Sequence, residues 1–90
     1  MKRAHIIVSG VVQGVSFRRF TEDNALKLGL KGYVKNLPNG DVEALVEGHE
    51  SSINQLIKKL NEGPPASKVD NIKISWHIHK NEFPSFERRH

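Results

Sequence analysis

Cysteine is absent from the chain, and other features that would indicate a particular class of protein are missing too. Without cysteine, neither a disulfide framework nor a thiolate nucleophile is available. No apolar run approaches the ~18 residues that a membrane-spanning helix needs. The first residues, MKRAHIIV, are positively charged, but their apolar run is too short for a signal peptide. We therefore expect a cytoplasmic protein that does not bind membranes and is stabilised by packing alone.

Charge of one sign is only mildly in excess, at a formal +4 from 14 basic and 10 acidic residues. This excess favours an anionic partner such as phosphate, but the basic residues are scattered in a way that is typical of a solvated surface. Ninety residues suit one domain, and a hydrophobic content of 37% with 27% charged residues excludes a disordered chain. We therefore expect a single domain over residues 1–90 and, by default, a monomer.

Periodic apolar patterns divide the chain into strands and helices. Strands are expected where apolar and polar residues alternate, and helices where apolar residues recur every three or four positions. Turn-forming residues, such as PNGD at 38–41 and GPP at 63–65, mark the breaks between them. The expected elements are a strand at 5–12, a helix at 17–28, strands at 31–37 and 42–47, a helix at 51–62 and a strand at 69–79.

Each helix is expected to bury one face. In the helix at 17–28, this face carries Phe17, Phe20, Asn24 and Leu28, with support from Ala25. In the helix at 51–62, apolar residues recur at the i, i+3, i+4 and i+7 positions, and Ser51 or Ser52 is expected to cap the first turn. The members of this second stripe are Ile53, Leu56, Ile57 and Leu60.

The remaining pattern indicates one antiparallel sheet. Asn39 and Gly40 are expected to supply the positive φ angles of a tight hairpin turn between the strands at 31–37 and 42–47. Crossover connections are right-handed, so both helices should lie on the same face of the sheet. The order βαββαβ therefore predicts an α+β, ferredoxin-like sandwich with two helices on one face of the sheet. Many functions use this fold, so the fold alone does not indicate an activity.

The stretch SGVVQGVSFRRF, at residues 9–20, is the part of the sequence that indicates chemistry. It places a glycine turn between a strand and a helix, where the first backbone N–H groups of the helix lack partners. Gly14 lets the chain bend with no Cβ in the way, and the amides of residues 15–17 can then turn toward a bound group. Arg18 adds a planar fork of donors that suits a phosphate. The stretch therefore predicts an anion site.

From the residues alone, a plainer interpretation stays open. Gly10 and Gly14 would then only shape a turn, and Arg18 and Arg19 would be solvated. The stretch is not a nucleotide-binding P-loop, because no Gly-Lys-[Ser/Thr] follows the glycines.

Two longer motifs carry a resemblance to a known family. The run VSGVVQGVSFR, at residues 8–18, resembles the first signature of the acylphosphatase family. The run GYVKNLPNGDVEALVEG, at 32–48, resembles its second signature, with Asn36, Gly40, Val42 and Gly48 in the expected places. TEDNALKLGL, at 21–30, is also similar to family members, so the resemblance covers nearly the whole chain.

The resemblance implies an enzyme that hydrolyses acyl phosphates without a metal or cofactor. It assigns binding of the phosphoryl group to Arg18 and orientation of the attacking water to Asn36. The loop amides of residues 13–17 are expected to complete the oxyanion contacts. Inorganic phosphate or sulfate is the anion expected to bind there. The implied substrate-binding residues are Gln13, Gly14, Val15, Ser16, Phe17 and Arg18.

These residue types also make chemical sense without the resemblance. The leaving group is a carboxylate whose conjugate acid has a pKa of about 4, so it departs without being protonated. Little general-acid catalysis is needed, which agrees with a motif that lacks His, Asp and Glu. A neutral amide such as Asn36 can hold water without repelling a phosphate dianion.

Two positions depart from the family pattern. Ser16 stands where many relatives carry glycine, and only modest effects on the loop are expected. Arg88 stands where relatives commonly place an aliphatic residue after the phenylalanine, here Phe86. Arg88 is expected to affect stability more than chemistry, and whether residues 82–90 form an ordered edge strand stays open.

Three alternatives remain. RNA-binding modules share the βαββαβ order, but they stack bases on aromatic residues, and the strands at 5–12 and 42–47 have none. An acylphosphatase-like domain can also be a non-catalytic binding scaffold or part of a carbamoyl-transfer protein, although intact Arg18 and Asn36 favour activity. His77 and His79 share a face but lack a third ligand, so solvated histidines are expected there rather than a metal site.

Overall fold

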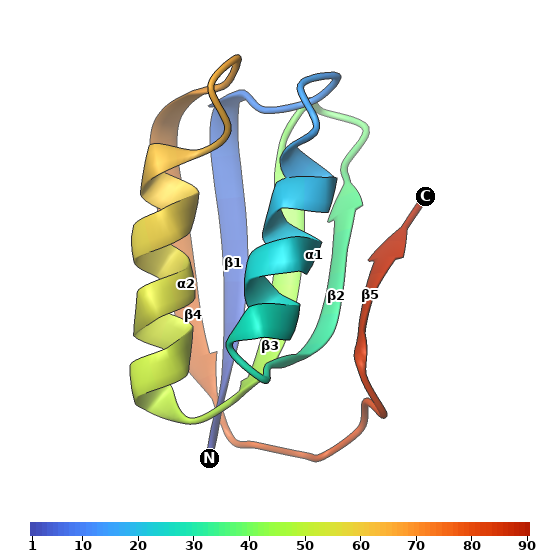
Figure 1. The fold of residues 1–90 in the computed structure, drawn as a ribbon, viewed down its shortest axis with the longest axis vertical. Coiled ribbons are helices and arrows are strands. Elements are labelled where there is room, and N and C mark those ends of the chain that lie inside the picture. The colour runs from blue at the N-terminus through green and yellow to red at the C-terminus, as the bar shows by residue number, and fades with distance from the viewer.

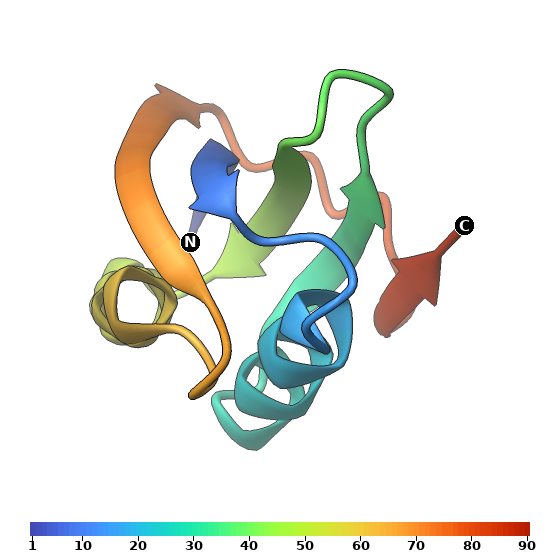
Figure 2. The ribbon, with the colours of Figure 1, turned by 90° about the horizontal axis from the view of Figure 1, so that it is seen from above.

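A five-stranded sheet covered on one face by two helices forms the protein (Figures 1 and 2). The computed structural model describes all residues from Met1 to His90. The strands are β1 (Lys2–Val11), β2 (Lys31–Asn36), β3 (Val42–Gly48), β4 (Lys68–His77) and β5 (Phe86–Arg89). The helices are α1 (Phe17–Lys27) and α2 (Glu50–Glu62). No helix is both long enough and apolar enough to cross a membrane.

The strand order confirms the predicted α+β, ferredoxin-like sandwich. The strands lie side by side as β4-β1-β3-β2-β5. β1 pairs antiparallel with both β3 and β4, and β2 pairs antiparallel with β3. β5 is a short fifth strand that pairs parallel with β2, so the sheet is mixed rather than wholly antiparallel as predicted. The segment at 82–90, which was left open, therefore contributes an edge strand.

The core lies between the sheet and the helices. Alternate residues of β1 and β3 point into it, and the predicted stripe of α2 supplies Ile53, Leu56 and Leu60. Burying each large apolar side chain contributes about 1.5–3 kcal/mol. The buried apolar residues are Ala4, Ile6, Val8, Val12, Phe17, Ala25, Leu30, Val34, Val42, Ala44, Val46, Ile53, Leu56, Leu60 and Phe86.

The buried face of α1 differs from the predicted one. Phe17, Thr21 and Ala25 are the buried residues, whereas Phe20 and Leu28 only pack against the edge of the core. Thr21 can be buried because its hydroxyl donates a hydrogen bond to the carbonyl oxygen of Phe17, at 2.9 Å. Small side chains on this face let α1 lie close to β2 and β5.

The start of α2 and the hairpin turn also correct the sequence predictions. The N-cap of α2 is His49 rather than Ser51 or Ser52, and it makes no side-chain cap. Glu50 lies in the first turn instead, where a carboxylate interacts favourably with the helix dipole.

The β2–β3 connection is longer than a two-residue hairpin. Only Gly40 has a positive φ there, at 99°, and Asn39 does not. The backbone N–H of Gly40 donates to the carbonyl of Leu37 at 3.1 Å, and the N–H of Leu37 donates to the carbonyl of Asp41 at 2.8 Å. Pro38 favours this arrangement because its ring fixes φ at the first corner of the turn.

β4 is shorter and more exposed than its alternating pattern predicts. It ends at His77, so Ile78 and His79 lie outside it. Ile74 and Trp76 point to the helical side of the sheet, yet they are 38% and 44% exposed. The reason is that β4 is an edge strand with no neighbour beyond it.

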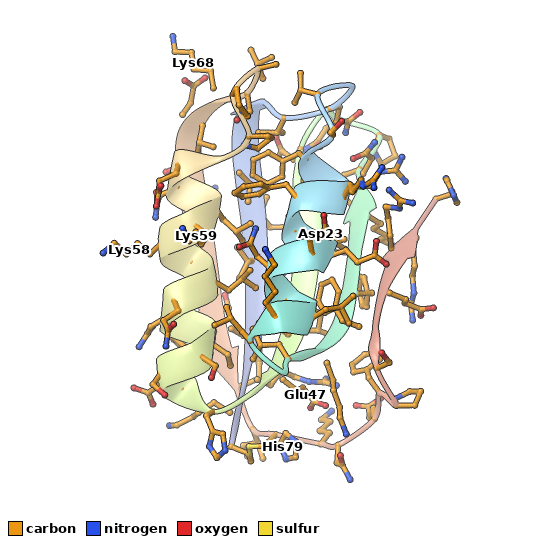
Figure 3. The ribbon with its side chains drawn as sticks, viewed as in Figure 1. Asp23, Glu47, Lys58, Lys59, Lys68 and His79 are labelled. Atoms are coloured by element: carbon orange, nitrogen blue, oxygen red, sulfur yellow. The ribbon has the colours of Figure 1, made fainter.

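A buried ion pair fixes the segment that leads from β4 across the end of the sheet to β5. Glu47 and Arg3 are both buried, and Nε of Arg3 donates to Glu47 Oε2 at 3.1 Å. Glu47 also accepts from the backbone N–H groups of Lys80, at 2.8 Å, and Glu82, at 3.2 Å. Figure 3 places Glu47 and His79 at this end of the molecule. The carboxylate therefore anchors the segment that delivers β5 to its place beside β2.

The pKa of Glu47 reflects these contacts. Burial alone would raise it, but the hydrogen bonds from Lys80, Glu82 and Arg3 outweigh burial and hold the pKa below its usual range. A carboxylate with a lowered pKa in the folded state stabilises the fold above its unfolded-state pKa, which is about 4.3. That stability is lost as the pH falls through the lower folded-state value.

We expect the substitution Glu47→Gln to destabilise the protein at pH 7 by about 3 kcal/mol, because it removes the buried carboxylate that pairs with Arg3 and leaves Arg3 only the half-exposed Glu82, at 2.8 Å. The loss of stability on acidification below about pH 4.3 should also be smaller than in the parent. Urea denaturation at pH 7 and at pH 3–5 measures both effects. Glu62→Gln, which changes an exposed carboxylate, serves as the control. Equal stability of the Glu47→Gln variant and the parent at pH 7 would contradict the anchoring role.

Candidate active site

A pocket of about 290 Å³ lies where the loop after β1 enters α1. This loop and the β2–β3 loop lie at the same end of the molecule, opposite the segment that crosses between β4 and β5 (Figure 1). The side chains around the pocket include cations and one amide but no carboxylate. The lining residues are Val12, Gly14, Ser16, Phe17, Arg18, Arg19, Asn36 and Arg88.

The loop enters the helix through two left-handed residues. Gly14 has φ 73° and Ser16 has φ 64°. A Cβ on Gly14 would meet no atom within 4 Å, so conformation, rather than the expected lack of space, is what favours glycine there. Ser16 adopts the same region with a side chain, which is uncommon for a residue that is not glycine, asparagine or aspartate.

The first turn of α1 leaves its backbone donors unpaired. Ser16 is the N-cap but makes no side-chain cap, and the turn contains no acidic residue. None of the N–H groups of residues 14–18 donates to a backbone carbonyl, and the first bond of the helix runs from the N–H of Phe20 to the carbonyl of Ser16, at 3.0 Å. Arg18 and Arg19 occupy this turn, where the helix dipole disfavours cations. Donors and charge together therefore favour an anion at this position.

Arg18 is held at the mouth of the pocket by the end of β5. Its Nη1 donates to the carbonyl oxygen of Arg89 at 2.7 Å and lies 3.4 Å from His90 Nδ1. Only one of its terminal nitrogens is used in these contacts, so the guanidinium keeps donors for a ligand.

Asn36 carries a buried acceptor without a partner. It is the last residue of β2, opposite Val42 of β3, and it lines the pocket. Its Oδ1 atom is buried and accepts no hydrogen bond from the protein. Leaving such an atom unsatisfied costs about 1–3 kcal/mol, so the arrangement favours a donor from a bound molecule.

Gln13 and Val15 belong to the loop but do not line the pocket. Nε2 of Gln13 donates to the carbonyl oxygens of Leu37 and Asp41, each at 2.8 Å. Val15 packs against the core. Gln13 thus ties the loop after β1 to the β2–β3 loop, which follows Asn36, and fixes the two sides of the pocket relative to each other.

The structure therefore brings together five of the predicted site residues and adds others. Gly14, Ser16, Phe17, Arg18 and Asn36 share the pocket, while the side chains of the other two support the loop. The additional lining residues, which sequence reasoning missed, are Val12, Arg19 and Arg88.

Arg88 corrects an expectation. It was expected to affect stability more than chemistry, but it lines the pocket from the short strand β5, where it lies opposite Val34 of β2. The signal in the sequence was its spacing from Phe86. Residues two apart on a strand share a face, and Phe86 is buried under the helices. Arg88 therefore contributes to the site.

Glu43 of β3 is a second carboxylate with a shifted pKa, and it lies on the face of the sheet away from the helices. Burial would raise the pKa of Glu43, but hydrogen bonds with His5 and Tyr33 outweigh burial and lower it. Burial and the nearby charge of Glu43 raise the pKa of the Tyr33 hydroxyl. These groups belong to the open face of the sheet, away from the pocket.

A second hollow, wide and shallow at about 700 Å³, lies at the opposite end of the molecule. Its apolar lining residues are Met1, Trp76 and Ile78, and His77 and His79 also line it. No three His, Asp or Glu side chains gather anywhere in the protein as a group that could hold a metal ion. We place the chemistry in the smaller pocket because only there do unpaired backbone donors meet a guanidinium and an unpartnered amide.

Replacing Ser16 with glycine should stabilise the protein by about 1 kcal/mol. The left-handed conformation costs an ordinary residue about 1–2 kcal/mol, and the greater backbone entropy of glycine offsets part of that gain. Urea denaturation checks the change. The matched control is Asn81→Gly, at φ 53°, which should gain less because asparagine tolerates this conformation. A Ser16→Gly variant less stable than the parent would refute the strain at this position.

Comparison with known proteins places the chain in a family. The family model described as Acylphosphatase matches residues 4–88. An acylphosphatase from Anaeromyxobacter dehalogenans is 45% identical over 87 residues, which cover 97% of this chain and 94% of the relative. The crystal structure of acylphosphatase from Bacillus subtilis superposes with a TM-score of 0.96 at 37% identity, over the full length of both chains.

The same fold also occurs inside a much longer protein. T. kodakarensis HypF is 36% identical with a TM-score of 0.86, and the match covers all of this chain but 12% of that one. Both the family model and the full-length relatives agree with the two motifs in the sequence. The chain therefore belongs to the acylphosphatase family.

Proposed function

We propose that the protein hydrolyses acyl phosphates, the mixed anhydrides of a carboxylic acid and phosphoric acid, to a carboxylate and inorganic phosphate. The observation that carries this proposal is the meeting of three features in one pocket. These are the unpaired N–H groups at the start of α1, the guanidinium of Arg18 and the unpartnered Oδ1 of Asn36. Each feature suits one requirement of phosphoryl transfer to water.

The backbone donors and Arg18 hold the phosphoryl group. The N–H groups of residues 14–18 and the positive end of the α1 dipole stabilise the equatorial oxygens, and Arg18 adds a charged, planar donor. These donors are fixed by the fold before the substrate binds, so little reorganisation is needed in the transition state. The hydrogen bonds of Gln13 fix this loop relative to the β2–β3 loop, which directly follows Asn36.

Asn36 orients the nucleophile. A water molecule that donates a hydrogen bond to Oδ1 would satisfy the buried acceptor and point a lone pair at phosphorus. The new bond joins the water oxygen to phosphorus, while the bond between phosphorus and the acyl oxygen breaks and its electron pair leaves with the carboxylate. The proton lost by water passes to a phosphate oxygen or to solvent.

No general acid is required for the leaving group. A carboxylate has a conjugate acid with a pKa of about 4, so it leaves as an anion at neutral pH. The work left to the protein is charge stabilisation and alignment, which amides and a guanidinium can supply. This agrees with a pocket lined by cations and an amide.

The RNA-binding alternative has no comparable support. An RNA-binding sheet needs exposed aromatic residues on its central strands, and neither β1 nor β3 has one. Tyr33, on the open face of β2, is covered by the guanidinium of Arg89, which lies 4.2 Å from its ring centre. The remaining alternative is a non-catalytic binding domain within a larger protein. The rate of benzoyl phosphate hydrolysis, described below, distinguishes this role from an enzyme.

The proposal includes a single domain over residues 1–90 that works as a monomer in the cytoplasm.

Arg18→Ala should keep the fold and lower kcat for benzoyl phosphate by at least ~10²–10³, the usual effect of losing one transition-state donor. Asn36→Ala should act mainly on kcat, because it misplaces the water and leaves the phosphate donors intact. The assay is run without added metal and in the presence of a chelator, and circular dichroism checks the fold.

Lys58→Ala, on the exposed side of α2 (Figure 3), is the charge-matched control and should behave as the parent does. A phosphate monoester, whose leaving group is far poorer, should be hydrolysed at a negligible rate. Parent-like kcat in the Arg18→Ala or Asn36→Ala variant would refute that residue's role. Absence of benzoyl phosphate hydrolysis by the parent would favour the non-catalytic role.

Inorganic phosphate and sulfate should stabilise the folded protein against heat. An anion that binds only the folded state adds about 1.4 kcal/mol at ten times its Kd. Thermal denaturation is followed at constant ionic strength, with chloride as the balancing salt. The shift should disappear in Arg18→Ala and persist in Lys58→Ala, which separates site binding from the general effect of these salts. An undiminished shift in Arg18→Ala would place the anion elsewhere.

A further inference from the structure

The pocket contains more positive charge than a single phosphoryl group needs. Besides Arg18, its lining includes Arg19 and Arg88, and it contains no carboxylate. The unpaired N–H groups and one guanidinium already suffice to surround the oxygens of one phosphate. A surplus of charge on one side of a site therefore needs an explanation of its own.

Arg88 reaches the pocket from a different element than the phosphate donors. It lies on β5, opposite Val34 of β2, and its side chain is on the same face of the sheet as that of Asn36, two residues farther along β2. Strand spacing and rise put the backbones of Arg88 and Asn36 about 8 Å apart. Arg88 therefore flanks the pocket on the β5 side.

The guanidinium of Arg88 is only loosely engaged within the protein. Its Nε lies 3.9 Å from Glu22 Oε1 of α1, and its side chain is 41% exposed. This contact is too long for a hydrogen bond, so the donors of Arg88 remain available. The neighbouring Arg89 is different, because its side chain pairs with Glu87 and stacks on Tyr33 across the opposite face.

The position of Arg88 on β5 would also accommodate an apolar side chain. An aliphatic residue there would extend the apolar row that begins with the buried Phe86. The partly exposed arginine can cover this row with its aliphatic stem and still present its charged end at the pocket that it lines.

We propose that Arg88, with Arg19 beside it, selects acyl phosphates whose acyl group carries a second anionic group, such as a carboxylate. This inference rests on the proposed hydrolysis of acyl phosphates and assigns its substrate class. The phosphoryl group occupies the loop amides and Arg18, the acyl chain leaves toward β5, and the distal anion meets the guanidinium of Arg88. Arg88 is thus a specificity determinant that does not contact the reacting atoms.

Rigid aromatic acyl phosphates test this selection. The first set is benzoyl phosphate, 4-carboxybenzoyl phosphate and the neutral isostere of the latter, 4-carbamoylbenzoyl phosphate. The para substituent cannot attack its own anhydride, and a second pair, 3-carboxybenzoyl phosphate and 3-carbamoylbenzoyl phosphate, places the charge at another position. The quantity compared is the ratio of kcat/KM for a carboxylated substrate to that for the neutral isostere.

The parent should prefer at least one carboxylated substrate to the isostere, and added salt should reduce this preference. Arg88→Gln should lower the ratio by about tenfold, as expected for loss of a charge-assisted hydrogen bond, and should lower kcat/KM for a carboxylated substrate more than kcat/KM for benzoyl phosphate. Arg88→Lys should retain part of the preference, because the charge remains but the planar fork is lost. Lys73→Gln removes the same charge from the exposed edge strand β4 and should leave the ratio unchanged.

The alternative outcomes are distinct. Equal losses for all substrates in Arg88→Gln would mean that Arg88 holds the transferred phosphoryl group, and an unchanged ratio would mean that it only faces Glu22. Either result overturns the proposed selectivity while the hydrolytic function stands. If the parent hydrolyses none of these substrates, the proposed function itself fails. Thermal denaturation of Arg88→Gln confirms that β5 remains in place.

Discussion

The uncapped N-terminus of α1 is the constraint around which the rest of the site is arranged. A helix usually begins with a side chain that accepts from its first N–H groups and with acidic residues in its first turn. Here the N-cap makes no such contact, and two arginines occupy the turn. The backbone reaches this state through left-handed conformations at Gly14 and Ser16, which direct the chain sharply from β1 into the helix. An anion in the pocket would satisfy both the donors and the charge, so local stability and ligand binding are linked at this point.

Distant parts of the chain complete the site. β5 supplies the carbonyl that holds Arg18 and the side chain of Arg88, and β5 is brought to β2 by a segment fastened to Glu47 at the far end of the sheet. The other wall is fastened by Gln13, which bonds two carbonyls of the β2–β3 loop. The Glu47 carboxylate and the Gln13 amide both form hydrogen bonds within the protein. The polar groups that remain without hydrogen-bond partners therefore lie mainly in the pocket. This separation explains how a small core can support a site with unsatisfied donors and an unsatisfied acceptor.

The features that could be predicted from the sequence are those set by local pattern. Alternation in β1 and β3 and the stripe of α2 identify their buried faces directly, and the turn before α1 indicated the anion site. The buried face of α1 could not be predicted in this way. Thr21 and Ala25 are buried because their small side chains allow the helix to pack closely against the sheet. Burial of Thr21 also depends on a hydrogen bond within the helix. Arg88 was misjudged for a similar reason, because its place in the pocket depends on the parallel pairing of β5 with β2, a contact between segments far apart in the chain.

Catalysis by this site requires few side chains. The carboxylate leaving group needs no proton, so the protein has only to stabilise the charge of the phosphoryl group and to align the attacking water with it. The central claim is that the N–H groups of residues 14–18 and Arg18 surround the phosphoryl group while Asn36 faces the attacking water. A crystal structure of the protein with orthovanadate tests this claim most directly. Vanadate oxygens are expected at about 2.7–3.1 Å from these N–H groups and from the Arg18 guanidinium, with Asn36 next to the apical oxygen. Vanadate bound elsewhere, or these N–H groups donating to acceptors of the protein itself, would contradict it.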